Sequence, residues 1–138
     1  MGTMNIGLDI HKTIDRYPKL FSDLTYDWRS MGYIIHILTG EPRDTAQKEV
    51  DDLDVLYDHF FSITDWARGQ DIAVEQTETG AWMDNVVWNN AKGIYCRKYG
   101  IDIHFDDTLD YAAAMPDFCT FILVGNNFES VWEQIMDL

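Results

Sequence analysis

Short apolar runs with the composition of β-strands alternate along this chain with segments that have helical features. The strand-like runs are MNIGLD (4–9), YIIHILTG (33–40), YDHFFSI (57–63), IDIHFDD (101–107) and FCTFILVG (118–125). Strands that alternate with helices favour a mostly parallel sheet covered on both faces. We therefore predict an α/β fold, a three-layer Rossmann-like sandwich around a central sheet of about five strands.

The segments between these runs are predicted to be helices at 17–32, 42–53, 82–100 and 129–138, from their apolar spacing and from the proline and glycine residues near their ends. Residues 64–82 show no clean period, and we interpret them as a loop excursion or a small flap. The 138 residues fit one domain of ordinary size, so we predict a single domain over 1–138.

Composition and charge narrow the classes of function. No apolar run approaches the roughly 20 residues that span a bilayer, and the N-terminus lacks the basic and apolar regions of a signal peptide. We therefore expect a cytoplasmic protein that does not enter membranes. The net charge of −14 argues against binding nucleic acid through a broad basic surface. A phosphorylated substrate stays compatible with this charge, because one divalent metal ion can reverse the local field.

Polar residues follow three of the predicted strands at the point where each strand ends. Asp9 ends the first run, Thr39 and Gly40 end the second, and Asp106 with Asp107 ends the fourth. Sites in open α/β sheets form outside the carboxyl ends of the strands. We expect these residues to converge at one edge of the sheet, with Lys92 reaching in from the helix that precedes the fourth strand.

This set of residues has a definite chemistry. Carboxylates that share a site repel one another unless a cation lies between them, and hard oxygen ligands suit Mg²⁺. An aspartate beside a metal ion can attack phosphorus and form an aspartyl-phosphate. The Thr39 hydroxyl and the Lys92 ammonium could hold the phosphoryl oxygens. These residues are therefore suited to phosphoryl transfer at a Mg²⁺ site.

Four motifs in this order resemble those of the haloacid dehalogenase (HAD) superfamily of phosphohydrolases. The stretch IGLDIHKTI resembles the family's first motif, hhhDxDx(T/V), and YIIHILTG resembles its second, an apolar strand that ends in Thr or Ser. The lysine of NNAKGIYC matches the third motif, a single Lys, and IDIHFDD resembles the fourth, an acidic pair at a strand end. The resemblance implies a Mg²⁺-dependent phosphomonoester hydrolase. In it, Asp9 would be the nucleophile, Thr39 would bind phosphate, and Lys92 would neutralise nucleophile and phosphate. The acidic, compact chain and the stretch WMDNVVWNNAK also resemble small HAD-like proteins of bacteriophages.

The same resemblance implies a set of Mg²⁺ ligands. Asp9 would be one, the backbone carbonyl at His11 a second, and Asp106 and Asp107 would complete the set, with Asp106 the more direct ligand of the pair. Thr13 falls on the small hydroxyl position of the first motif.

His11 departs from the family pattern, which places a second aspartate there to protonate the leaving group. Lys12 likewise replaces the usual glycine. A histidine titrates near neutrality and can do acid–base work, although a protonated imidazole brings positive charge close to the metal. Three readings stay open: an enzyme that uses His11 as acid/base, an enzyme with slow or altered turnover, and a catalytically impaired HAD-fold binding or regulatory protein.

The chain has no room for the separate cap domain that many HAD proteins carry, so the resemblance implies a small capless member with an open site. Such members act on large substrates, or they borrow a lid from a neighbouring subunit. In the second case this protein would be a homo-oligomer. An open site favours a nucleic-acid or protein phosphate, whereas the net charge favours a small nucleotide or sugar phosphate. Both substrate classes stay open.

The remaining candidates have simpler structural interpretations. His36, His59 and His104 lie in strand-like runs and are expected to be strand or core histidines; a zinc enzyme would require two of them to meet. EVDDLD (49–54) is expected to be a solvated helix end. Trp66 and Trp82 are the better ligand candidates among the tryptophans, and Trp28, Trp88 and Trp132 are expected in the core.

Overall fold

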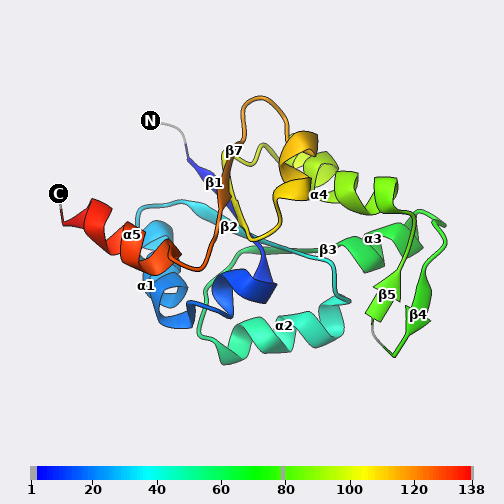
Figure 1. Cartoon of the computed structure of the whole chain (residues 1–138), viewed down its shortest axis with the longest axis horizontal. Coiled ribbons are helices and arrows are strands. Elements are labelled where there is room, and N and C mark those ends of the chain that lie inside the picture. The colour runs from blue at the N-terminus through cyan, green and yellow to red at the C-terminus, as the bar shows by residue number, and fades with distance from the viewer. Residues whose placement is uncertain (1–2, 79, 138) are drawn as a thin grey trace.

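A five-stranded sheet forms the centre of the protein (Figure 1). The structure is a computed structural model, which describes residues 3–78 and 80–137. The strands are β1 (Asn5–Leu8), β2 (Ile34–Thr39), β3 (His59–Ser62), β6 (Ile103–Asp106) and β7 (Thr120–Leu123). Their order is β3-β2-β1-β6-β7, and each neighbouring pair is parallel. The predicted fold class is confirmed.

The register of the sheet brings the strand ends together. Leu8 of β1 pairs with Ile37 of β2 on one side and with Phe105 of β6 on the other. The residues that follow or close these strands, Asp9 and Asp106, therefore lie at the same edge of the sheet. Thr39, the last residue of β2, pairs with Ser62 and lies at that edge as well.

Helices cover both faces of the sheet. On one face lie α1 (Pro18–Ser30), α2 (Arg43–Asp52) and α5 (Phe128–Met136), as Figure 1 shows. Phe21, Val50 and Phe128 of these helices share one apolar core with Ile35 and Ile37 of β2. On the other face lies α4 (Asn85–Tyr99), whose Cys96 packs in a second core with Leu38 and Ile101. Ile37 and Leu38, successive residues of β2, belong to different cores because successive side chains of a strand point to opposite faces.

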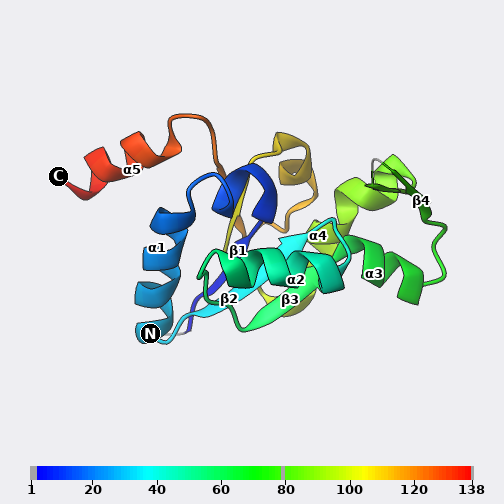
Figure 2. The same cartoon turned by 90° about the horizontal axis from the view of Figure 1, so that it is seen from below.

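Residues 64–82, which we predicted to be a loop or flap, contain more regular structure than their sequence suggests. Helix α3 (Ile63–Gly69) is followed by β4 (Glu75–Thr77) and β5 (Gly80–Trp82), which pair antiparallel. Ser62 caps α3, because its hydroxyl accepts a hydrogen bond from the backbone N–H of Asp65 at 3.1 Å. Figure 2 shows this hairpin at one end of the molecule and α5 at the other.

Helix α4 begins later than predicted and ends where predicted. The Asp84 carboxylate accepts hydrogen bonds from the N–H groups of Val86 and Val87, at 2.9 and 3.3 Å, and so caps the first turn. Gly100, with a φ of 66°, ends the helix in the left-handed conformation that glycine adopts at little cost. Among the helices of the described residues, none has the length and apolar character needed to cross a membrane.

Candidate active site

Lys92 of α4 is buried, at 1% exposure, and its ammonium contacts two carboxylates. Lys92 Nζ donates to Asp9 Oδ1 at 3.0 Å and to Asp106 Oδ2 at 2.7 Å. The same nitrogen lies 4.4 Å from the centre of the Tyr111 ring, within cation–π range. The structure therefore brings together Asp9 and Asp106, which we predicted at two strand ends, and Lys92, which we predicted on a helix.

The path of α4 past the sheet depends on a glycine beside Lys92. A Cβ atom on Gly93 would overlap the backbone carbonyl of Ala114, in the short helix η2 (Leu109–Ala114). The missing side chain lets η2 pack against α4, and this contact places Tyr111 over Lys92. Trp88, one turn earlier on α4, donates its indole N–H to the Tyr111 hydroxyl at 2.6 Å and fixes that ring.

Thr39 is buried at the end of β2, and the loop that follows is tightly held. The Thr39 hydroxyl accepts a hydrogen bond from the N–H of Glu41 at 3.3 Å, and the Gly40 carbonyl accepts one from the Thr64 hydroxyl at 2.6 Å. The Trp88 indole lies so close to Gly40 that a Cβ atom there would overlap the ring. Gly40 is therefore required for close packing.

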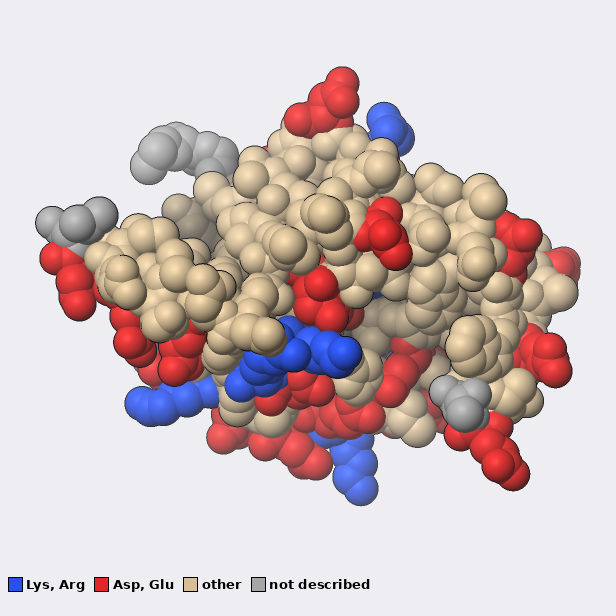
Figure 3. Space-filling model, viewed as in Figure 1, with Lys and Arg blue, Asp and Glu red and all other residues tan. Residues whose placement is uncertain are grey.

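These residues line one side of a cleft of about 1030 Å³, which Figure 3 shows as a hollow right of the centre of the face, with acidic side chains around it. The strand ends contribute Asp9, Thr39 and Asp107, and α4 contributes Lys92. The opposite side is formed by α3 and the hairpin, which contribute Arg68, Gln76 and Trp82. The excursion 64–82 thus forms one wall of the cleft.

The two adjacent aspartates at the end of β6 have different environments. Asp106 is fully buried: its Oδ2 lies 2.9 Å from His104 Nε2 as well as near Lys92, and its Oδ1 accepts the N–H of Thr108 at 3.1 Å. Asp107 is half-buried and lines the cleft. Carboxylate oxygens of Asp9, Asp106 and Asp107 lie within 4.8 Å of one another and could hold a metal ion. Because protein donors occupy both Asp106 oxygens, Asp9 and Asp107 are better placed to contact an ion in the cleft.

The charges of this group depend on one another. Burial raises the pKa of Asp9 to about 7; the nearby Lys92 opposes this rise, and Asp106 adds to it. Burial alone would lower the pKa of Lys92, but the two carboxylates raise that pKa above its usual range. Burial would raise the pKa of Asp106, but Lys92 and His104 outweigh burial and hold the pKa below its usual range. Lys92 and Asp106 thus form a stable ion pair, and Asp9 becomes fully ionised near neutrality only with a further cation nearby.

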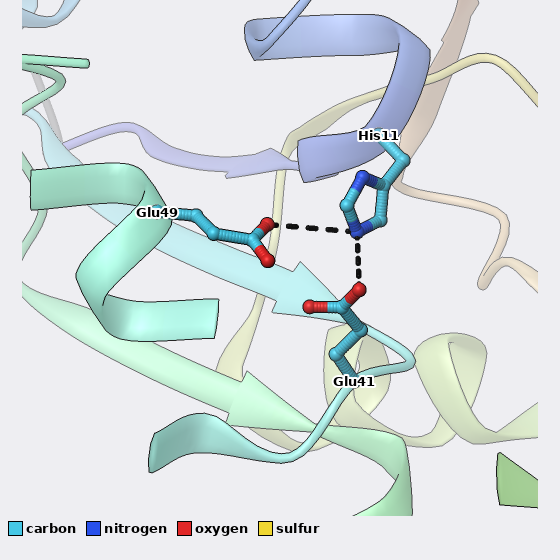
Figure 4. Close-up of side chains that lie close together, drawn as sticks. All are labelled: His11, Glu41 and Glu49. Atoms are coloured by element: carbon cyan, nitrogen blue, oxygen red, sulfur yellow. Dashed lines mark hydrogen bonds and ion pairs between the residues drawn. The ribbon is translucent and has the colours of Figure 1, made fainter. Parts of the chain in front are cut away.

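The His11 side chain faces a different set of carboxylates. His11 lies in the kinked helix η1 (Ile10–Ile14), and its imidazole is half-exposed. Nδ1 lies 3.2 Å from Asp15 Oδ2, and Nε2 lies 2.7 Å from Glu41 Oε1 (Figure 4). Partial burial would lower the His11 pKa, but Glu41, Asp15 and Glu49 together raise it. The imidazole, which could act as acid/base under one of our three readings, is therefore held between carboxylates on the cleft wall.

Lys12, which follows His11, has left-handed backbone geometry with a φ of 59°. This conformation favours glycine, the residue that Lys12 replaces in the family pattern to which we compared the sequence. The N–H of Lys12 donates to Asp15 Oδ1 at 2.6 Å, and this hydrogen bond holds the turn. Thr13 is buried, and its hydroxyl has no hydrogen-bond partner among the described residues.

Two of the three strand histidines lie close together, which is one requirement of a zinc site. The rings of His36 and His59, paired on neighbouring strands, have their centres 4.8 Å apart. However, the two His36 nitrogens lie 2.8 Å from the Tyr95 hydroxyl and 2.9 Å from Asn5 Oδ1. Among the described residues, the two groups that could hold a metal ion contain no strand histidine. The geometry favours the structural interpretation of these side chains.

The tryptophans divide differently from our expectation. Trp28 and Trp132 pack against the core, as expected, and Trp82 lines the cleft. Trp66 instead packs near Phe61, with ring centres 6.2 Å apart. Trp88, which we expected in the core, lines the cleft. Sequence reasoning also missed Glu41, Arg68 and Tyr111 in the cleft lining, and Glu49, which we interpreted as part of a solvated helix end, lines the cleft as well. For Glu41 a signal existed, because it follows Thr39-Gly40 at a strand end.

Comparison with known proteins gives no assignment. No family model matches the chain, and no curated protein or solved structure is significantly similar to it. What the protein does has to be inferred from the site itself.

Proposed function

We propose that this protein is a Mg²⁺-dependent phosphatase of the HAD type, which cleaves phosphomonoesters through an aspartyl-phosphate on Asp9. One observation carries the proposal: the buried Lys92 ammonium bridges Asp9 and Asp106 at the edge of the sheet where Thr39 and Asp107 line the same cleft. A buried cation beside a carboxylate and a hydroxyl provides donors for phosphoryl oxygens next to a nucleophile. The site thus supports phosphoryl transfer better than proton transfer alone.

The residues present fit a magnesium ion. Asp9 and Asp107 would hold it with oxygen ligands, together with the backbone carbonyl of His11 that the resemblance implies, while Asp106 keeps Lys92 in place. When bound, Mg²⁺ supplies positive charge that neutralises phosphoryl oxygens and favours the ionised form of Asp9. The raised pKa of Asp9 supports this fit, because its carboxylate lacks one further cationic partner.

The reaction would proceed in two steps. In the first, the Asp9 carboxylate attacks phosphorus, the phosphorus–oxygen bond to the leaving group breaks, and the leaving oxygen takes a proton. In the second, water attacks the aspartyl-phosphate, which releases inorganic phosphate and restores Asp9. Lys92 and Thr39 would hold the phosphoryl oxygens in both steps.

His11 would supply the proton in the first step and receive one from water in the second. The carboxylates around His11 raise its pKa and so favour the protonated form, as a general acid requires. The contact with Glu41 also favours the second candidate function, a catalytically impaired HAD-fold binding or regulatory protein. In that case His11 would stay held between Asp15 and Glu41 and would not reach the leaving group.

The cleft favours a small substrate over a polymer. Its walls include Glu41, Asp44 and Glu49, which would repel the additional phosphates of a nucleic acid. Its volume accommodates a nucleotide or a sugar phosphate, and Trp82 offers an aromatic surface for the group attached to the phosphate. We therefore propose a small nucleotide or sugar phosphate over a nucleic-acid or protein phosphate.

An aryl phosphate assay with added Mg²⁺ tests the function. The wild-type chain should turn over, Asp9→Asn should lose nearly all activity, and acid quenching should trap a phosphorylated wild-type chain. Asp44→Asn, on the same cleft wall, is the matched control and should keep its activity. Turnover that survives Asp9→Asn would contradict the mechanism. Activity that is absent in the wild type but present in His11→Asp would establish the impaired alternative instead.

A further inference from the structure

A second group of metal-ligating side chains lies on the cleft wall, apart from the carboxylates around Lys92. It consists of His11 from η1, Glu41 from the loop after β2, and Glu49 from α2. Figure 4 shows the three side chains pointing toward one another from these separate elements. Because His11 is 30 positions away from Glu41 in the chain, its meeting with the two glutamates is a property of the fold and not of local sequence.

The distances suit a shared ion. His11 Nε2 lies 2.7 Å from Glu41 Oε1 and 3.7 Å from Glu49 Oε2, and one ligand atom of each residue lies within 4.8 Å of the others. Ligands bound at about 2.0–2.2 Å to one tetrahedral ion lie about 3.3–3.6 Å apart. The Glu49 contact already has nearly this spacing. Glu41, which is 36% exposed on a loop, would have to move by less than about 1 Å.

The His11 ring is oriented as a metal ligand would be. Asp15 Oδ2 lies 3.2 Å from Nδ1, and the other Asp15 oxygen accepts the N–H of Lys12, so the carboxylate is itself held. Metal-binding histidines commonly donate their other ring N–H to a carboxylate, which fixes the tautomer and directs the free nitrogen at the ion. Here the nitrogen on the far side of the ring from Asp15 is Nε2, and it faces the two glutamates.

The glutamates lack cationic charge that an ion would provide. Glu41 Oε2 is shielded from solvent and has no hydrogen-bond partner among the described residues. Burial raises the pKa of Glu49, and the adjacent Glu41 raises it further, so the two carboxylates repel one another. A single imidazolium cannot balance both of them. An oxygen atom buried without a partner is costly, and binding of a cation would remove that cost.

We propose that His11, Glu41 and Glu49 form a binding site for a divalent transition-metal ion of the Zn²⁺ class. An imidazole combined with carboxylates favours such an ion over Mg²⁺, which prefers oxygen ligands alone. Three protein ligands leave a coordination position open toward the cleft, as in catalytic zinc sites. The site shares no carboxylate with Asp9 and Asp107, and it does not depend on the phosphatase proposal. While an ion occupies Nε2, the His11 imidazole cannot act as the acid/base of that reaction.

Titration with Co²⁺, a spectroscopic substitute for Zn²⁺, in excess Mg²⁺ tests this site. The wild-type chain should bind one Co²⁺ in this site, with visible absorption bands that Zn²⁺ abolishes by displacement. Glu49→Gln, Glu41→Gln and His11→Asn should each weaken binding by about tenfold or more. These side chains are partly exposed, so the variants should fold, and a far-ultraviolet circular dichroism spectrum checks this.

Two control variants locate the bound ion. Asp44→Asn removes a neighbouring charge of the same cleft wall, and Asp107→Asn removes a carboxylate of the Lys92 side; both should leave the Co²⁺ affinity within about twofold. Three results would overturn the proposal: no Co²⁺ bands in the wild type, affinity unchanged in Glu49→Gln, or affinity lost in Asp107→Asn. Loss of phosphatase activity alone would not bear on it, because the readout is metal binding.

Discussion

The ammonium nitrogen of Lys92 lies 3.0 Å from Oδ1 of Asp9, although the two residues are 83 positions apart in the chain. The contact joins α4 to the end of β1 across the carboxyl edge of the sheet. Because both partners are buried, the ion pair is costly to break and holds the proposed nucleophile in a fixed position.

Replacement of the buried lysine should damage both stability and function. Lys92→Met leaves Asp9 and Asp106 facing each other without a cation, so we expect a loss of about 3–5 kcal/mol in the free energy of unfolding. Urea unfolding followed by circular dichroism measures this. Lys98→Met, an exposed lysine on the same helix, is the control and should change stability by less than about 0.5 kcal/mol. Equal stabilities of the two variants would contradict the ion pair.

The adjacent aspartates should separate into a ligand and a support. Asp107→Asn should weaken Mg²⁺ binding by about tenfold with little change in stability, because Asp107 lines the cleft. Asp106→Asn should lower stability, because Lys92 and His104 lose their charged partner. Calorimetric Mg²⁺ titration and urea unfolding measure the two effects. If Asp107→Asn binds Mg²⁺ as the wild type does, Asp107 is not a ligand.

Binding of Mg²⁺ should depend on pH through Asp9. The ion-free carboxyl group has a pKa of about 7, so below that pH it is protonated and must lose its proton when the metal binds. We expect the Mg²⁺ affinity to rise as the pH increases from about 6 to about 8, with proton release that shrinks over the same range. Calorimetry in buffers of different ionisation enthalpy detects the release. In Asp9→Asn the release should vanish, and its persistence would exclude Asp9 as the source.

The contact between α4 and η2 should tolerate no side chain at its closest point. Gly93→Ala places a methyl group against the Ala114 carbonyl, so we expect a destabilisation of about 1–3 kcal/mol. Gly69→Ala, at the end of α3 where the new methyl group meets open space, should be neutral or stabilising by about 0.5–1 kcal/mol. Thermal unfolding compares the two, and a Gly93→Ala variant as stable as the wild type would refute the close packing.

The left-handed turn at Lys12 predicts an unusual gain in stability. Lys12→Gly should raise the free energy of unfolding by about 0.5–1 kcal/mol, because glycine adopts a φ of 59° without the Cβ clash. Lys12→Ala removes the same charge but keeps the Cβ atom, and it should show no gain. Urea unfolding of the three proteins measures the difference. A glycine variant no more stable than the alanine variant would mean that this backbone is not strained.

The sequence predicted the parallel sheet because each strand carries a clear apolar run between clear breaks. MNIGLD and IDIHFDD both became central strands, and their buried residues Ile6, Leu8 and Phe105 belong to one apolar core. The short elements within 64–82 escaped prediction. A helix of 7 residues that starts at a serine cap, and strands of 3 residues each, are too brief to leave a readable period.

The candidate site was predictable to the extent that it follows strand ends. Asp9, Thr39 and Asp106 came from that rule, and Lys92 came from the predicted helix that leads into the fourth strand. The sequence could not predict the direction of a side chain. Nothing in IGLDIHKTI indicates that His11 turns toward Glu41 and Glu49. Tyr111 was missed for a similar reason, because its position over Lys92 depends on the glycine contact between α4 and η2.

The ion pair between α4 and the sheet has a consequence for experiment. Its partners come from the first strand, the fourth helix and the strand after it, so a molecule captured beside them gains its affinity only from the fully assembled domain. By mass action such a molecule raises the melting temperature of the whole chain. A thermal-shift screen of metal salts and phosphate esters can therefore search for ligands without any assumption about turnover.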